Sequence, residues 1–221
     1  MLDTTKRPDK GRKKMEHYYQ DVEGWWGEPD VSKYKEMVRK FDSGSHFVEI
    51  GSFTGKSTAC MGVEIINSGK EIKYDQVDTW LGSTEHRGDP SIIGGTLFDE
   101  FNKNTEKVSH VINPIRLASV EASKLYEDES LDFVFIDAAH DLVNVLKDIT
   151  SWIPKVKKGG VIAGHDYGGG FFGVNGAVDN YFAQIPEAKV ESTPDCSWWL
   201  VNKNFQIPEY LDFQYVWNKI Q

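Results

Sequence analysis

The amino-acid sequence predicts an α/β fold: a doubly wound, mostly parallel seven-stranded sheet with a C-terminal antiparallel hairpin. Three observations predict it. Short apolar runs alternate with helical segments, a glycine loop follows the first run, and acidic or histidine side chains stand where several runs end. The chain has 221 residues, which suits one domain with additions at its ends.

Five apolar runs have the continuous β-branched and aromatic character of strands that are buried on both faces. In chain order they are Phe47–Ile50, Ile72–Val77, Val108–Ile112, Leu131–Ile136 and Val161–Ala163. Two further runs, Ala188–Ser192 and Cys196–Val201, are separated by Pro194-Asp195. This pattern predicts a hairpin at the end of the sheet.

Apolar side chains recur at helical spacing before and between these runs. The stripes are Tyr34–Phe41, Leu142–Ile153 and Val174–Ile185, and Asp141 is placed to cap the second. We therefore divide the chain into a basic tail with a helical cap (1–44), an α/β domain (45–203) and an aromatic-rich tail (204–221). The last segment is expected to pack on the body or on a partner subunit, which would allow a homodimer.

The charge distribution bears on the kind of partner. The net charge is −9, although residues 1–14 are basic, so the body is strongly acidic. An acidic body repels phosphate backbones, so no nucleic acid is expected as a partner, and the basic tail is interpreted as a solvated terminus rather than a nucleic-acid arm. Two cysteines without metal spacing, and no signal-peptide or membrane-spanning run, predict a cytoplasmic protein without a membrane partner.

The loop after the first run is the most informative stretch. Glu49-Ile50-Gly51-Ser52-Phe53-Thr54-Gly55-Lys56-Ser57 leads from a strand through a tight turn into a helix. A phosphate loop would need four residues between its glycines, and only three lie between Gly51 and Gly55. A dinucleotide fingerprint would need a glycine in place of Phe53. The loop is therefore expected to contact something smaller than a diphosphate.

This loop resembles the first motif of the class I S-adenosylmethionine-dependent methyltransferases, specifically of their small-molecule O-methyltransferase branch (catechol- and caffeoyl-type, and sugar or macrolide O-methyltransferases). The resemblance extends over about residues 45–203 and implies a Rossmann-like methyltransferase fold that binds S-adenosylmethionine. It implies that Gly51, Ser52 and Gly55 form the loop around the methionine half of the cofactor, with Glu49 near its amino end.

Two more positions are assigned to the cofactor. Asp78 ends the second run, where a carboxylate can accept hydrogen bonds from both ribose hydroxyls, as in the family. A strand-terminating Asp in a turn is the alternative. Ser119 falls where the resemblance implies a contact with the adenine.

The fourth and fifth runs carry the expected chemistry. Leu131–His140 resembles the fourth strand of the catechol- and caffeoyl-type enzymes, which implies that Asp137 binds a divalent metal beside the cofactor and that His140 is a general base. The segment Gly164-His165-Asp166-Tyr167 follows the fifth run, and the resemblance implies that His165 and Asp166 complete the metal site. Ligands of open α/β folds bind beyond the carboxyl ends of the strands, where these side chains would meet.

The metal site departs from the family in one residue. The family uses oxygen ligands that suit Mg²⁺ at this point, whereas the nitrogen of His165 suits Mn²⁺, Fe²⁺ or Zn²⁺ better. Two aspartates alone could still hold Mg²⁺. In the alternative without a metal, His165 is a second catalytic base or a packed strand-end histidine.

The predicted activity is therefore methyl transfer to a hydroxyl oxygen of a small molecule such as a sugar, a natural product or a catechol-like compound. Ala138 and Ala139 stand where amino-methylating relatives carry prolines, which favours oxygen. Residues 25–27 and 80–95, the latter with His86 and Arg87, are candidate covers of the substrate site. The alternatives are a nucleotide-binding enzyme of the P-loop or dehydrogenase type, and an inactive protein of the same fold that only binds partners.

Overall fold

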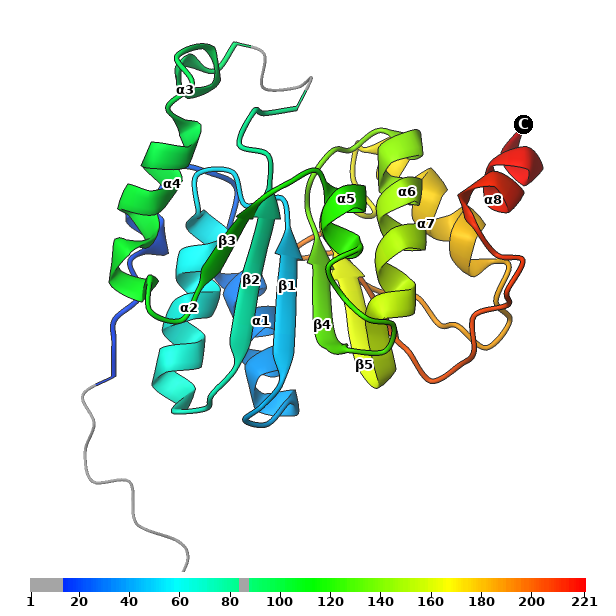
Figure 1. Cartoon of the computed structure of the whole chain (residues 1–221), viewed down its shortest axis with the longest axis horizontal. Coiled ribbons are helices and arrows are strands. Elements are labelled where there is room, and N and C mark those ends of the chain that lie inside the picture. The colour runs from blue at the N-terminus through cyan, green and yellow to red at the C-terminus, as the bar shows by residue number, and fades with distance from the viewer. Residues whose placement is uncertain (1–13, 84–87) are drawn as a thin grey trace, which may run out of the picture.

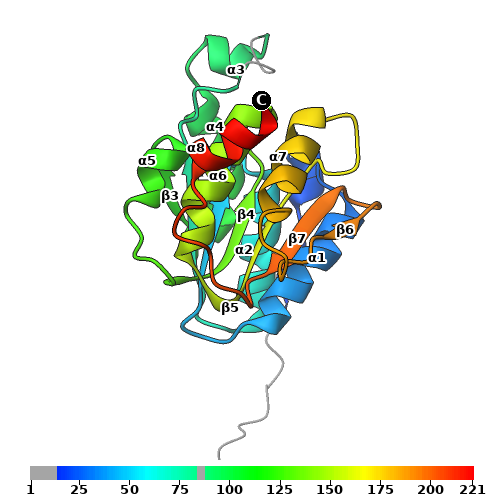
Figure 2. The ribbon, with the colours of Figure 1, turned by 90° about the vertical axis from the view of Figure 1, so that its right-hand side faces the viewer.

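A computed structural model describes residues 14–83 and 88–221 of the chain. Seven strands form one sheet in the order β3-β2-β1-β4-β5-β7-β6. Figure 1 shows β3, β2, β1, β4 and β5 side by side, and Figure 2 shows β7 and β6. Their bounds are β1 (His46–Ile50), β2 (Lys73–Asp78), β3 (Asn113–Arg116), β4 (Leu131–Ile136), β5 (Val156–Gly164), β6 (Glu191–Thr193) and β7 (Trp198–Asn202). His86, Arg87 and the basic residues before Lys14 lie outside the described residues.

The first five strands are parallel, and their order reverses between β1 and β4. Strand β7 pairs antiparallel with both β5 and β6, so the predicted C-terminal hairpin is confirmed. Because β1 lies between β2 and β4, the carboxyl ends of these strands meet at one edge of the sheet, where ligands of doubly wound folds bind.

Helices cover both faces of the sheet (Figure 2). They are α1 (Glu28–Lys40), α2 (Lys56–Ser68), α3 (Pro90–Ile93), α4 (Leu97–Thr105), α5 (Ser119–Ser123), α6 (Leu142–Trp152), α7 (Phe172–Phe182) and α8 (Phe213–Ile220), with 3₁₀ turns at Tyr19–Asp21, Glu106–Val108 and Ile153–Lys155. Apolar side chains of α1 and α2 share one core with the β1 face that carries Phe47. Those of α5, α6, α7 and α8 share the other core with the face that carries Val48.

The predicted caps and stripes agree with these helices. Asp141 accepts a hydrogen bond from the backbone N–H of Asn144 at 3.1 Å, as expected for the cap of α6. The aromatic-rich tail forms α8, which lies against α6 and α7 and buries Val216. None of the described helices is long and apolar enough to cross a membrane.

The third predicted strand was wrong in its position. The residues Val108–Ile112 form the end of a 3₁₀ turn and a loop, and β3 begins only at Asn113. The side chain of Val108 is buried because it fills the space that Gly62 leaves on α2, where a Cβ would lie 2.6 Å from the Cβ of Val108. Strand β3 lies at the sheet edge, which tolerates Pro114 and needs less apolar character.

Candidate active site

Gly51 brings the loop after β1 against the end of β4. Its φ is +87°, and a Cβ at this position would lie 2.0 Å from the carbonyl oxygen of Asp137. The backbone N–H of Gly51 donates to Val77 at 2.9 Å, and that of Asp137 donates to Ile50 at 2.7 Å. Only glycine permits this approach, which ties the ends of three strands together.

Asp78, at the end of β2, holds the same loop in place. Its Oδ2 accepts hydrogen bonds from the backbone N–H groups of Ser52 and Phe53 at 2.9 and 3.0 Å, and its Oδ1 accepts one from Trp80 at 2.8 Å. Phe53 takes a left-handed conformation with φ +45°, and its carbonyl accepts a bond from the indole of Trp80. The carboxylate predicted to bind ribose therefore also shapes the loop.

Glu49 and Gly55 connect the loop and its strand to neighbouring elements. Gly55 is the N-cap of α2 with φ +91°, and a Cβ there would lie 2.6 Å from Thr105 on α4. Glu49 is buried and accepts hydrogen bonds from the hydroxyls of Ser57, Thr58 and Tyr74. Glu49 lies on the face of β1 that carries Phe47, because side chains alternate along a strand, and Gly55 lies against α4. Their predicted contacts with the cofactor stay predictions.

Two cavities open at the carboxyl ends of the strands. We name the first, of about 550 Å³, the aromatic cavity, and the second, of about 360 Å³, the polar cavity. The wall of the aromatic cavity includes Trp25, Trp26, Phe53, Lys56, His165 and Phe171. The wall of the polar cavity includes Asp78, Thr79, Ser119, Asp141 and Asn144. Gly51, Asp137 and His140 border both, so the two cavities are neighbours.

Ser119 begins α5 and lies in the wall of the polar cavity, as its predicted role requires. Its Oγ accepts a hydrogen bond from the indole Nε1 of Trp152 at 2.9 Å, which orients the hydroxyl. Ser52 lies in the wall of the aromatic cavity, and its Oγ is buried without a hydrogen-bond partner among the described residues.

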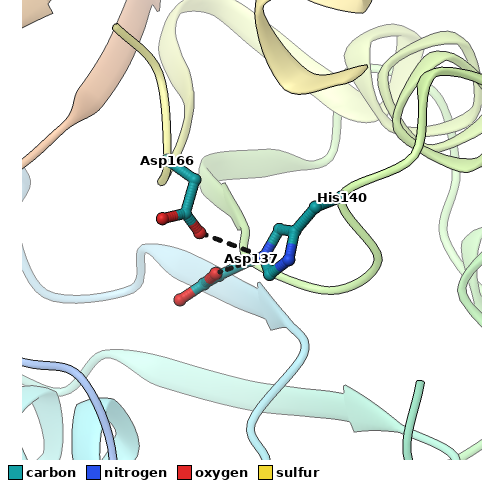
Figure 3. Close-up of side chains that lie close together, drawn as sticks. All are labelled: Asp137, His140 and Asp166. Atoms are coloured by element: carbon teal, nitrogen blue, oxygen red, sulfur yellow. Dashed lines mark ion pairs between the residues drawn. The ribbon is translucent and has the colours of Figure 1, made fainter. Parts of the chain in front are cut away.

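The side chains of Asp137, His140 and Asp166 converge on one another (Figure 3). Nε2 of His140 lies 3.0 Å from Oδ2 of Asp166 and 3.7 Å from Oδ1 of Asp137, and one ligand atom from each residue lies within 4.8 Å of the others. Asp137 follows β4, and Asp166 follows β5 with a left-handed φ of +62°. A non-glycine residue in this conformation must be held by its surroundings, which is common at functional sites.

The charges of this cluster are strongly coupled. Burial lowers the pKa of His140, but hydrogen bonds and charge from Asp137 and Asp166 outweigh that effect and raise the pKa to about 11. Burial raises the pKa of Asp166, but the two histidines beside it hold it well below its usual range. The two carboxylates beside Nε2 therefore favour the protonated form of His140.

His165 does not join this cluster, which corrects the predicted metal set. Its Nε2 lies 3.4 Å from Oδ1 of Asp30, and its Nδ1 lies 3.4 Å from Oδ1 of Asp166. The ligand atoms that converge belong instead to Asp137, His140 and Asp166. Burial lowers the pKa of His165, but Asp166 and Asp30 raise it to about 10. Asp30 was missed in the sequence because an acid in the first turn of a helix is ordinarily a cap.

The converging groups fit a divalent cation. The carboxylates of Asp137 and Asp166 supply the oxygen ligands that Mg²⁺ and Mn²⁺ take, and the imidazole of His140 would lie beside the cation as a base. All three side chains are partly buried and border the cavities, which leaves room for an acceptor atom beside the cation.

The buried carboxyl of Glu49 should make stability depend on pH. Burial raises the pKa of Glu49 to about 7, against the hydrogen bonds that lower it. The folded state then binds more protons than the unfolded state between about pH 4 and pH 7, so the unfolding free energy should fall as pH rises through that window. The unfolding free energy, measured with urea, should fall less between pH 5 and pH 8 in Glu49→Gln than in the wild type. The difference between the two proteins should be roughly 3 kcal/mol. An equal fall in both proteins would mean that Glu49 is ionised throughout.

Known proteins resemble this chain both in sequence and in three-dimensional structure. A family model described as a methyltransferase domain matches residues 48–167. The uncharacterized protein y4gI of Sinorhizobium fredii is 28% identical over 119 residues, which are 54% of this chain. The chain spans only 13% of the length of that curated relative.

Solved structures with the same fold are distant in sequence. The O-methyltransferase NovP has a TM-score of 0.62 at 14% identity and covers 79% of each chain. CalS11, a TDP-rhamnose 3'-O-methyltransferase, has a TM-score of 0.58 at 11% identity over 79% of this chain and 78% of its own. The O-methyltransferase TomG from Streptomyces achromogenes has a TM-score of 0.57 at 11% identity over 82% of each chain. At these identities the likeness establishes the fold.

Proposed function

The chain belongs to the methyltransferase-domain family, and we propose that it transfers a methyl group from S-adenosylmethionine to a hydroxyl oxygen of a small molecule, assisted by a divalent metal. The observation that carries the proposal is the position of Asp137 and His140. Both border the polar and the aromatic cavity, at the place where a cofactor in one and an acceptor in the other would meet.

The polar cavity suits the nucleoside half of the cofactor. Backbone N–H groups use three of the four lone-pair sites of the Asp78 carboxylate, so a ribose hydroxyl can still donate to the remaining site on Oδ1. Ser119 offers its hydroxyl at the far wall. At the shared border, the buried Oγ of Ser52 can bond a polar group of the methionine half, which would satisfy an otherwise unpartnered atom.

The aromatic cavity suits an acceptor that carries a ring. Trp25 is 76% exposed, an unusual state for so large an apolar side chain, and its ring stacks at 6.4 Å from that of Phe53. The ring of Phe171 lies 4.5 Å from that of His140 and is 40% exposed. These flat faces favour a planar or sugar-like ring over an extended polymer. The three structural neighbours above are named as O-methyltransferases, which supports oxygen as the acceptor.

Much of the rate enhancement would come from holding acceptor and cofactor in attack geometry. A divalent cation at Asp137 and Asp166 would polarise the acceptor hydroxyl and neutralise the carboxylates that keep His140 protonated. Nε2 of His140 would then accept the hydroxyl proton as the oxygen attacks the methyl group. Trp25 and Phe171 would cover the acceptor and limit the access of water.

Binding of S-adenosylhomocysteine tests the cofactor assignment. We expect micromolar affinity by calorimetry, typical of a pocket that encloses a nucleoside of this size. ATP and NAD are the controls and should not compete, because the loop lacks the spacing for a diphosphate. Tight ATP binding with no binding of the homocysteine product would contradict the proposal.

Chelation tests the metal. Removal of divalent ions should abolish turnover and leave the affinity for S-adenosylhomocysteine largely intact, because the polar cavity does not depend on Asp166. Added Mn²⁺ or Mg²⁺ should restore activity. Full turnover by protein that metal analysis shows to be empty would assign activation of the acceptor to the histidines alone.

A further inference from the structure

Asp30, in the first turn of α1, is a buried carboxylate beside the cluster. Its side chain is 7% exposed. Oδ2 accepts a hydrogen bond from the backbone N–H of Gly27 at 2.7 Å, and Oδ1 accepts one from the indole Nε1 of Trp198 at 3.0 Å. These two neutral donors leave the charge without a countercharge, and a buried charge is costly unless it is paired.

The basic side chain beside Asp30 is His165. In the described part of the chain, His165 is the basic side chain whose nitrogen lies within 4.0 Å of this carboxylate, with Nε2 at 3.4 Å from Oδ1. The ring of Trp26 lies beside the imidazole at 5.9 Å and tilted by 34°. The imidazole therefore packs against Trp26 on one face, and its Nε2 lies within ion-pair distance of Asp30.

The other nitrogen of His165 faces the centre. Nδ1 lies 3.4 Å from Oδ1 of Asp166, and Oδ2 of the same carboxylate lies 3.0 Å from His140. Four side chains thus form a continuous series from α1 to the base: Asp30, His165, Asp166 and His140. Asp166 needs such support, because its backbone has a left-handed φ and three glycines, Gly168–Gly170, follow close behind.

We propose that Asp30 is a positioning residue of the centre. By binding Nε2 of His165, it directs Nδ1 of that imidazole to Asp166 and so sets the direction in which the Asp166 carboxylate faces His140 and Asp137. The inference rests on the proposed function only in treating this cluster as the catalytic centre. In this arrangement His165 contacts the proposed metal ligand Asp166 and orients it, and does not itself bind the metal.

The experiment uses the whole chain and the variants Asp30→Asn, His165→Asn and their double variant. Asparagine removes the charge and keeps one oxygen, which can accept from either Gly27 or Trp198, so one of these two hydrogen bonds is lost as well. Asp75→Asn is the matched control: Asp75 is 8% exposed and pairs with Nε2 of His46 at 2.7 Å, on the opposite edge of the sheet. The readouts are the ¹⁵N resonances of the imidazoles, Mn²⁺ affinity and S-adenosylhomocysteine affinity.

Asp30→Asn should shift the ring resonances of His165 and leave those of His46 in place, and Asp75→Asn should do the reverse. Asp30→Asn should weaken Mn²⁺ binding about tenfold, the lower range for a supporting partner of a metal ligand. In the His165→Asn background the same substitution should change Mn²⁺ affinity less than twofold, because the two residues act in series.

Unmoved His165 resonances in Asp30→Asn, or an equal loss of Mn²⁺ affinity in both backgrounds, would reduce Asp30 to a helix cap. If Asp30→Asn does not fold, His165→Asn tests the series from its other end, and unchanged Mn²⁺ affinity there would overturn the proposal. The proposed function fails separately, when wild-type protein does not bind S-adenosylhomocysteine. The resonance shift of His165 does not depend on that result.

Discussion

Replacing Gly51 with alanine is expected to lower the unfolding free energy by about 3 kcal/mol or more and to abolish cofactor binding. The added Cβ would lie 2.0 Å from the carbonyl oxygen of Asp137, and φ of +87° is a conformation that L residues rarely adopt. Relief of the contact requires the loop and the end of β4 to separate, which moves Asp137 out of the cluster. Urea unfolding and calorimetry with S-adenosylhomocysteine measure the two effects.

Gly69→Ala is the matched control for backbone strain. Gly69 has a φ of +69° at the end of α2, and a Cβ there would meet nothing within 4 Å. It should cost only about 1–2 kcal/mol, the penalty of a left-handed conformation, and leave binding unchanged. If Gly51→Ala behaved like Gly69→Ala in both measurements, the close approach of the two loops would not be needed for the site.

Replacing His140 with alanine should lower kcat by about 10²–10⁴-fold once an acceptor is known, the usual value of general-base catalysis. The affinity for S-adenosylhomocysteine should change little, because His140 lies at the border of the two cavities and the proposed nucleoside contacts come from Asp78 and Ser119. The rise of kcat with pH that marks an essential base should disappear in the variant. Steady-state kinetics over a pH series measure both.

An exposed histidine provides the comparison. His110 is exposed and lies near the amino ends of the strands, far from the cluster. His110→Ala should therefore leave kcat unchanged. A fall of less than threefold in His140→Ala, with the pH dependence retained, would place the base elsewhere. His165 would then be the next residue to test, since its Nδ1 also faces Asp166.

The sequence alone determined the fold and the elements that carry the cluster. The predicted fourth strand, Leu131–Ile136, has the observed bounds, and Asp141 caps α6 as expected. The spacing of Asp137 and His140 was sufficient to predict that both would stand at the same strand end. These features depend on apolar periodicity and capping, which are written in neighbouring residues.

Only the tertiary structure decided which atoms these side chains face. The side chain of Glu49 faces α2, where it accepts a hydrogen bond from Thr58. Asp78 accepts hydrogen bonds from the glycine loop and also lines the polar cavity. Its predicted ribose contact stays a prediction. His165 lies between Asp166 and Asp30, a residue of the first helix that the sequence did not indicate. Such partners come from segments far apart in the chain. Their pairing depends on how the helices pack on the sheet, and the local pattern around each residue carries no record of it.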